Sequence, residues 1–185
     1  MGSIRIIIGG PPNSGKSTFS ESLARLFQDQ GFDAEAIDLD KASPTLELIR
    51  HKISKEERNS MKRNLTKEDA DNAKKEYISK SKEHQIVIGD GPGKISEESK
   101  IIYSSGTVGI IVCREDYKKE IKNWEYFFEE LNVKLIAVII SKNNGEESVN
   151  SNDLIHGVLV KLNREVLKTP TLIEFLLLLR KKLDI

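Results

Sequence analysis

Cysteine, histidine and long apolar runs are scarce in this sequence of 185 residues. A single cysteine, Cys113, excludes an internal disulfide and is typical of a reducing compartment, so we expect a cytoplasmic protein. The three histidines, His51, His84 and His156, do not have the spacing of a metal-binding motif. No apolar run approaches the roughly 18 residues of a membrane-spanning helix, and no signal-peptide pattern occurs, so no membrane partner is expected.

A net charge is also lacking. The chain carries 29 basic and 29 acidic side chains, which gives no general attraction to nucleic acid or to an anionic membrane surface. Its length fits one domain spanning residues 1–185. Composition therefore favours a soluble single-domain protein, and function has to be inferred from motifs.

The most informative motif lies near the beginning and fits the Walker A pattern G-x-x-x-x-G-K-[ST]. Its residues are Gly10, Pro11, Pro12, Asn13, Ser14, Gly15, Lys16 and Ser17, followed by Thr18. The β-branched segment 4–8 precedes this loop, and apolar residues at helical spacing follow it over residues 17–30. Strand, glycine loop and helix in this order are the context that the motif requires, so residues 10–18 are expected to bind a nucleoside triphosphate.

The residue types explain the expected chemistry. Gly10 and Gly15 allow the backbone to turn its N–H groups toward phosphate oxygens. Lys16 would reach the β- and γ-phosphates and act as a catalytic cation, and the hydroxyl of Ser17 would bind Mg²⁺. The alternative is a glycine-rich turn with a chance lysine. MgATP is the cofactor expected from the first interpretation.

Short apolar segments alternate with helical ones along the whole chain. Their continuous apolar character is typical of parallel strands covered on both faces. The pattern predicts an α/β fold of the P-loop NTPase class, with a doubly wound, mostly parallel sheet of five or six strands. The expected strands are residues 4–8, 34–38, 85–89, 107–113 and 133–140, with a weak sixth at 157–162.

Residues 41–84 are polar and contain several helix-start signals. Ser43-Pro44 resembles a cap before a first-turn proline, and the pairs Ser54–Glu57 and Thr66–Asp69 resemble capping boxes. We expect two or three short polar helices inserted after the second strand. This insertion is either a solvated helical face or a lid and acceptor-binding region that supplies cations near the transferred group.

The third strand ends in Asp90-Gly91-Pro92-Gly93, which has the Walker B form. Asp90 is expected to hold Mg²⁺ and to contribute to catalysis, and Gly93 to contact the γ-phosphate. The alternative for Asp90 is a strand-end carboxylate that caps the next turn.

Asp38-Leu39-Asp40 follows the second strand, at the end of the sheet where this fold collects ligands. In P-loop small-molecule kinases a carboxylate here faces the acceptor hydroxyl, so Asp38 or Asp40 is a candidate catalytic base for a small-molecule or nucleotide acceptor. Successive strand residues point to opposite sides, so only one of the two is expected to serve. The alternative is a loop turn followed by a helix cap.

Two further patterns bear on the type of nucleotide and of P-loop. Residues 141–144 are Ser-Lys-Asn-Asn, where guanine-specific P-loop proteins often carry N-K-x-D, so ATP is expected rather than GTP. The glycine loop lacks a second lysine near its start, which argues against the partition-ATPase type of Walker A loop.

Two amphipathic helices are also predicted. One carries an apolar stripe of Tyr117, Ile121, Trp124, Phe127, Phe128 and Leu131. The other begins at a capping box of Thr171 with Glu174 and is apolar nearly all round. One side of this last helix is expected to pack on the sheet. Another side is a candidate homodimer contact, and the alternative is that the helix serves core burial alone.

The motifs also resemble a particular family. The segment from Gly9 to Ser17, together with Asp90-Gly91-Pro92-Gly93 and Trp124 before residues 135–139, is similar to P-loop domains fused to CRISPR-associated ring nucleases. The nuclease module itself is not part of this sequence. The resemblance implies a kinase-like nucleotide-binding domain and a CRISPR-associated protein as partner.

Two functions remain open at this stage. The first is a small kinase-like phosphotransferase or ATPase that uses MgATP, with Asp38 or Asp40 facing the acceptor. The second is a nucleotide-dependent switch, or a regulatory partner in a CRISPR-type defence system, with little or no catalysis. The polar insertion and Asp38 favour the first. The D-x-x-G pattern of Asp90 and Gly93 and the family resemblance favour the second.

Overall fold

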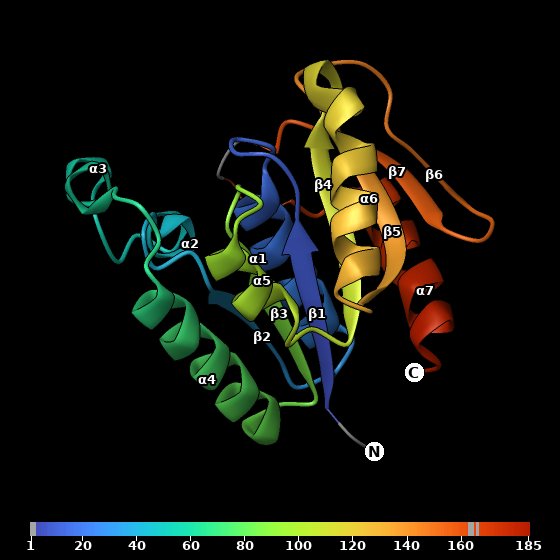
Figure 1. Cartoon of the computed structure of the whole chain (residues 1–185). Coiled ribbons are helices and arrows are strands. Elements are labelled where there is room, and N and C mark those ends of the chain that lie inside the picture. Colours follow the sequence, from blue (N-terminus) through green and yellow to red (C-terminus); the bar gives the residue numbers. More distant parts are fainter. Residues whose placement is uncertain (1–2, 163–164, 166) are drawn as a thin grey trace.

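A seven-stranded sheet runs through the centre of the computed structural model, which describes residues 3–162, 165 and 167–185 (Figure 1). The strand order in the sheet is β2-β3-β1-β4-β5-β7-β6, and every neighbouring pair is parallel except the edge pair β6–β7. The strands are β1 (Ile4–Gly9), β2 (Ala34–Asp38), β3 (Ile86–Asp90), β4 (Val108–Arg114), β5 (Lys134–Lys142), β6 (Ser148–Ser151) and β7 (Ile155–Val160).

Helices cover both faces of this sheet, so its central strands are buried on two sides (Figure 1). On one face, α1 and α7 pack on the sheet, and Phe19 and Phe175 meet edge to face at 5.5 Å. On the other face lie α4, α5 and α6, and an aromatic cluster around Tyr103 and Phe128 joins α5 to α6. The helices are α1 (Lys16–Asp29), α2 (Thr45–Ile49), α3 (Lys55–Met61), α4 (Lys67–Glu83), α5 (Glu97–Tyr103), the 3₁₀ helix η1 (Glu115–Glu120), α6 (Ile121–Glu130) and α7 (Pro170–Leu183).

The predicted α/β class and mostly parallel sheet are confirmed, with one strand more than expected. All six predicted strands are present, within a few residues of the expected bounds. The additional strand is β6, whose residues Ser148–Ser151 are mostly exposed. An antiparallel strand at the edge of a sheet needs no apolar run, so the search for continuous apolar segments missed it.

The insertion after β2 forms three helices, and they differ in how they are anchored. Helix α4 is 17 residues long, and Ala70, Ala73 and Tyr77 are buried against the sheet. It is therefore a regular layer of the fold and not a short polar helix. Helices α2 and α3 project beside the carboxyl end of the sheet, and α3 has no buried residue (Figure 1).

Local capping agrees with the sequence-based predictions in two places and differs from them in two. The capping boxes Ser54–Glu57 and Thr66–Asp69 are both formed. Helix α7 begins at Pro170 and not at Thr171, because the side chain of Thr169 accepts a hydrogen bond from the N–H of Leu172. A proline fits the first turn of a helix since its missing N–H would have no partner there.

The second difference concerns Ser43-Pro44. Helix α2 begins at Thr45 and its preceding residue, Pro44, makes no side-chain cap. The predicted apolar stripe is shorter than expected, because Tyr117 lies at a kink in η1 and is 40% exposed, outside the buried stripe of α6. No helix among the described residues is long and apolar enough to cross a lipid bilayer.

Candidate nucleotide-binding site

The glycine loop connects β1 to α1 at the carboxyl end of the sheet, and two of its glycines are required by their surroundings. Gly10 has a φ of +136°, and a Cβ atom there would lie 1.9 Å from the carbonyl oxygen of Val112. Gly15 has a φ of +88°, and a Cβ atom there would lie 2.5 Å from the Cβ atom of Leu162. Both positions therefore exclude larger residues, which explains the pattern of the motif.

Lys16, at the first position of α1, is buried beneath this loop. Its ammonium group donates hydrogen bonds to the carbonyl oxygens of Gly10 and Pro11, each at 3.0 Å. Burial lowers the pKa of Lys16, and the nearby carboxylate of Asp90 opposes this effect. The lysine is therefore a cation held close to the loop, where phosphate oxygens would compete with the carbonyl groups.

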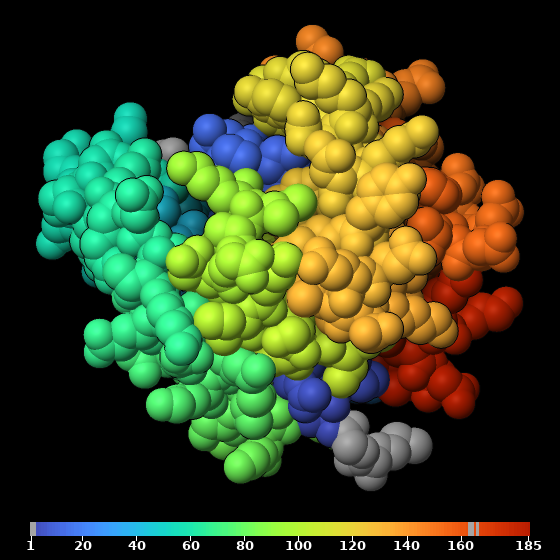
Figure 2. Space-filling view, in the orientation of Figure 1, coloured from blue at the N-terminus to red at the C-terminus, as the bar shows by residue number. Residues whose placement is uncertain are grey.

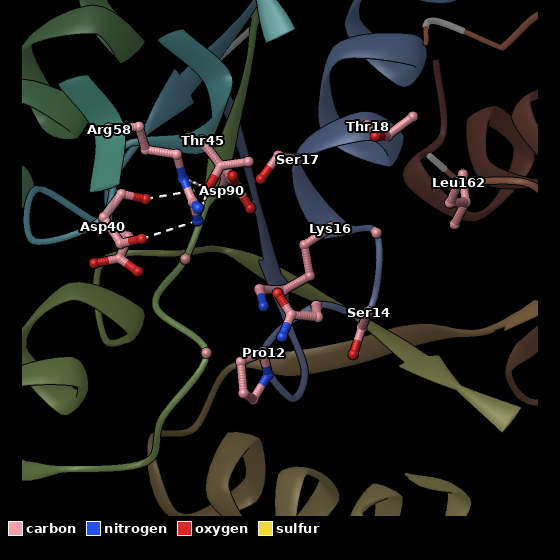
Figure 3. Close-up of a pocket in the computed structure, with 15 residues that line it drawn as sticks. Pro12, Ser14, Lys16, Ser17, Thr18, Asp40, Thr45, Arg58, Asp90 and Leu162 are labelled. Carbon is pink, nitrogen blue, oxygen red and sulfur yellow. Dashed lines mark hydrogen bonds between the residues drawn. The ribbon is translucent and has the colours of Figure 1, made fainter. Parts of the chain in front are cut away.

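A cavity of about 470 Å³ opens beside the loop (Figure 3). It contains most of the residues that the sequence analysis singled out, but Gly10, Pro11 and Asp38 are not in its wall. The lining residues are Pro12, Asn13, Ser14, Gly15, Lys16, Ser17, Thr18, Asp40, Ser43, Thr45, Arg58, Asp90, Gly91, Gly93 and Leu162.

Asp90 lies at the end of β3, in register with Ile8 of β1 and Asp38 of β2. Its carboxylate is buried, and it lines the same cavity as Ser17. Burial raises the pKa of Asp90 to about 6, although Lys16 and Ser17 act in the opposite direction. In addition, Oδ1 of Asp90 is buried without a hydrogen-bond partner among the described residues.

These observations fit Mg²⁺. Asp90 offers a carboxylate oxygen without a partner, and Ser17 offers a hydroxyl group in the same cavity. Mg²⁺ uses such oxygen ligands together with nucleotide phosphates. No cluster of three acidic, histidine or cysteine side chains able to hold a metal is found in the described part of the chain. Asp90 and Ser17 would therefore hold the ion only with oxygens from the nucleotide and from water.

The two carboxylates after β2 have different environments. Asp38 accepts hydrogen bonds from the N–H of Leu46 at 2.9 Å and of Asp40 at 3.1 Å, one on each oxygen. Burial raises the pKa of Asp38 well above its ordinary value, and the charge of Asp90 raises it further. Asp40 lies in the wall of the cavity, where burial raises its pKa and Lys16 lowers it. Of the two, Asp40 is the one placed to meet a ligand.

Arg58 is a cavity residue that the sequence analysis did not single out. It extends from α3, and its Nη2 donates to the hydroxyl groups of Ser43 at 3.0 Å and Thr45 at 2.8 Å (Figure 3). In the sequence it was one of several basic residues of the insertion, and nothing distinguished it from the others. Only the fold shows that α3 brings this cation opposite the glycine loop.

The loop after β3 contacts the glycine loop directly. A Cβ atom on Gly93 would lie 2.9 Å from the Cα atom of Pro12, so the two loops pack backbone to backbone. The hydroxyl group of Tyr103 donates to the carbonyl oxygen of Pro92 at 2.9 Å and fixes this turn. The predicted residues Asp90 and Gly93 are thus brought to the same cavity as Lys16 and Ser17.

Comparison with known proteins agrees with this geometry. Residues 6–176 match the family model CbiA, described as the CobQ/CobB/MinD/ParA nucleotide binding domain. The chain belongs to this family. No curated protein matches the sequence.

Solved structures with the same fold cover nearly the whole domain. A plasmid partition-type protein from Borrelia burgdorferi B31 bound to AMPPNP has a TM-score of 0.63 at 13% identity, covering 97% of this chain and 99% of that chain. Cobyrinic acid a,c-diamide synthase from Mycobacterium smegmatis, with an ATP analogue and magnesium, has a TM-score of 0.65 at 10% identity, covering 97% and 95%. MinD from Pyrococcus horikoshii OT3, with Mg-ADP, has a TM-score of 0.58 at 13% identity, covering 94% and 77%.

The family assignment bears on two inferences from the sequence, the one from the missing second lysine and the one from the CRISPR-associated resemblance. Lys16 is the one lysine between Gly9 and Ser17, yet the chain falls in the family that includes ParA and MinD, so a missing second lysine does not separate it from them. The resemblance to CRISPR-associated proteins is supported only at the level of the P-loop class, since none of the matches named above is of that kind.

Proposed function

We propose that this protein binds MgATP and transfers the γ-phosphoryl group to an acceptor, or to water as an ATPase. The observation that carries the proposal is the position of Asp40 and Arg58, which come from outside the glycine loop and line the same cavity as Lys16 and Asp90. A carboxylate and a cation beyond the phosphate-binding residues are the groups that phosphoryl transfer requires.

The roles of the loop residues follow from their chemistry. The backbone N–H groups of residues 12–18 would bind the phosphate oxygens, and Lys16 would exchange its two carbonyl partners for them. Ser17 and Asp90 would hold Mg²⁺, which neutralises charge on the phosphates when bound. The solved structures of similar fold contain such ligands: AMPPNP, Mg-ADP, and an ATP analogue with magnesium.

The acceptor side is assigned to Asp40 and Arg58. Asp40 would orient the attacking hydroxyl group and accept its proton, because its carboxylate lies at the cavity wall. Arg58 would stabilise the negative charge that develops on the transferred group. Asp38 stays the weaker candidate for the base, since both of its oxygens already accept hydrogen bonds from the backbone.

The test is turnover of ATP labelled in the γ-phosphate, with free phosphate and labelled acceptor separated by chromatography. Lys16→Ala should reduce MgATP affinity by at least about tenfold, because a charge-assisted hydrogen bond is lost. Asp40→Asn should keep MgATP binding and lower turnover. Lys67→Ala, an exposed cation outside the cavity, is the control. Equal MgATP affinity of Lys16→Ala and the wild type would refute the site.

ATP is proposed in preference to GTP, because residues 141–144 offer no acidic side chain to read guanine. The fold alone does not determine which base is bound, because a protein of similar fold was solved with GDP. This protein, the signal recognition particle 54 kDa protein from Aeropyrum pernix K1, has a TM-score of 0.57 at 18% identity, covering all of this chain and 50% of that chain. Direct competition between the two nucleotides decides the point, and a large preference for GTP would overturn this choice.

A second function is favoured by a separate observation. Gly93 packs against Pro12, so a change at the γ-phosphate would be transmitted to the loop before α5. A protein of this design would be a nucleotide-dependent switch, including a regulatory partner in a CRISPR-type system as the sequence resemblance implies. Binding of MgATP without turnover, together with different amide-exchange protection of residues 91–96 in AMPPNP and ADP, would favour the switch.

A further inference from the structure

A second cavity of about 430 Å³ adjoins the phosphate cavity, which is the 470 Å³ cavity beside the glycine loop. The two share Pro12, Asp40, Ser43 and Gly93, so Asp40 stands at their boundary. The second cavity lies between the insertion and the segment after β3, which border each other in Figure 2, where they are coloured teal and lime green. Its other lining residues are Ala42, Lys62, Arg63, Asn64, Leu65, Pro92, Lys94, Ile95, Ser96 and Glu98.

The charged side chains of this cavity are the cations Lys62, Arg63 and Lys94 and the carboxylates Asp40 and Glu98, and they are unevenly paired. Arg63 forms a two-point ion pair with Asp69, one contact of which is 2.7 Å, so its charge is already neutralised. The ammonium groups of Lys62 and Lys94 have no hydrogen-bond or ion-pair partner among the described residues. These two lysines come from different segments, Lys62 directly after α3 and Lys94 from the loop before α5.

The remaining lining fits a small polar molecule with a short carbon chain. Leu65 and Ile95 offer apolar surface, and Asn64 and Ser96 belong to the polar wall. The cavity volume is within the range of small-molecule sites, which are about 300 to 1,000 Å³. Two unpaired cations in such a space would bind a carboxylate or phosphate group.

We propose that the second cavity is the acceptor site and that the acceptor is a small anionic alcohol. Its carboxylate or phosphate group binds between Lys62 and Lys94, and its hydroxyl group lies at Asp40. This inference rests on the proposed phosphoryl transfer and specifies the substrate class of the same site. The shared residues allow the hydroxyl group to enter the phosphate cavity while the anionic group stays in the second one.

The reaction is balanced with MgATP as co-reactant. The hydroxyl oxygen of the acceptor forms a bond to the γ-phosphorus, and its proton moves to the carboxylate of Asp40. The bond between the γ-phosphorus and the bridging oxygen breaks, and its electron pair stays on the β-phosphate of ADP. The products are a phosphorylated anion and ADP.

The experiment uses calorimetric titration of the protein loaded with Mg²⁺ and AMPPNP. The probes are D-glycerate, sn-glycerol 3-phosphate and glycerol, which share hydroxyl groups but differ in charge. We expect the two anions to bind and glycerol to bind at least tenfold more weakly. Glycerol binding as tightly as the anions would overturn the proposal.

Variants assign any binding to the second cavity. Lys62→Ala combined with Lys94→Ala should weaken both anions by about tenfold or more, since each lysine supplies a charge-assisted contact. The control, Lys55→Ala combined with Lys67→Ala, removes two exposed lysines of the insertion that do not line the cavity and should bind the anions as the wild type does. Unchanged anion affinity in the first double variant would overturn the proposal.

The affinity for AMPPNP is measured in the same preparations, and folding is followed by the melting temperature. Failure to bind AMPPNP would refute the proposed function itself. Binding of AMPPNP without binding of either anion would refute only the acceptor class. The two failures are therefore distinguishable.

Discussion

The carboxylate of Asp38 accepts a hydrogen bond from the backbone N–H of Leu46, 2.9 Å away, in the first turn of α2. Its other oxygen accepts from the N–H of Asp40 at 3.1 Å. A residue from the end of β2 therefore caps a helix that begins several residues later, in place of the cap expected from Ser43. This contact fixes the segment that carries Asp40 and Thr45 to the cavity wall.

The first prediction concerns this cap. Asp38→Ala should lower the free energy of unfolding by about 1 to 2 kcal/mol, because a helix cap and a buried acceptor are lost. MgATP binding should persist, since Asp38 is outside the phosphate cavity. Urea denaturation and calorimetry measure the two effects. If Asp38→Asn is as stable as the wild type but abolishes phosphoryl transfer, Asp38 is the base, as the sequence alone allowed.

The second prediction is a pH dependence at Asp90. The pKa of this group is raised from its ordinary 3.8 to about 6 by burial, so the folded protein takes up a proton that the unfolded chain still lacks between these values. The stability contributed by this group therefore increases as pH falls through that window and is lost as pH rises through about 6. Mg²⁺ requires the ionised carboxylate, so affinity for MgAMPPNP should fall as pH decreases below about 6.

Asp90→Asn separates this effect from protonation of the nucleotide. Its Mg²⁺ dependence should be weaker, and its affinity for MgAMPPNP should vary with pH only as the phosphate groups do. The difference between wild type and variant, measured from pH 5 to about 7.5 by calorimetry, is assigned to Asp90. Parallel pH curves for the two proteins would contradict a metal-binding role.

Sequence reasoning located the parts of the site that are continuous along the chain. Gly10, Gly15 and Lys16 form one loop whose geometry is set by local backbone chemistry, and Asp90 ends an apolar strand next to it. Parallel strands bring such ends together at one edge of the sheet, so their meeting could be foreseen.

Side chains that reach the cavity across the fold could not be found in this way. Arg58 depends on how α2 and α3 are placed, and that placement depends on the contact between Asp38 and Leu46. An ion pair of 2.8 Å between Glu21 and Arg50 also connects α1 to the end of α2. The spacing of these two residues in the sequence does not reveal this contact. Strand β6 was missed for a related reason, because a polar edge strand is defined by its partner β7 and not by its own pattern.

The third prediction tests Arg58 against a neighbour on the same helix. Arg58→Ala should lower phosphoryl transfer by about ten- to a thousandfold while changing MgATP affinity less, because charge on the transferred group is greatest in the transition state. Lys55→Ala removes an exposed cation of α3 that does not line the cavity and serves as the control. Equal loss of affinity and of turnover in Arg58→Ala would indicate ordinary substrate binding.

The last prediction concerns a homodimer through α7, for which the apolar character of this helix makes one face a candidate. The structure divides this helix into two faces: Leu172, Phe175, Leu176 and Leu179 are buried, whereas Ile173 is 37% and Leu177 is 53% exposed. Only the second face is available to another subunit. Leu177→Glu should therefore leave the melting temperature nearly unchanged, since the introduced charge remains in water.

Light scattering then decides the oligomeric state. If α7 forms the contact, Leu177→Glu should convert a dimer to a folded monomer, because a buried charge without a partner is costly at an interface. Leu179→Glu is unsuitable for this purpose, since Leu179 is fully buried and its replacement would unfold the protein. A wild-type protein that is monomeric with and without MgAMPPNP, or a dimer that survives Leu177→Glu, would exclude this helix face as the dimer contact.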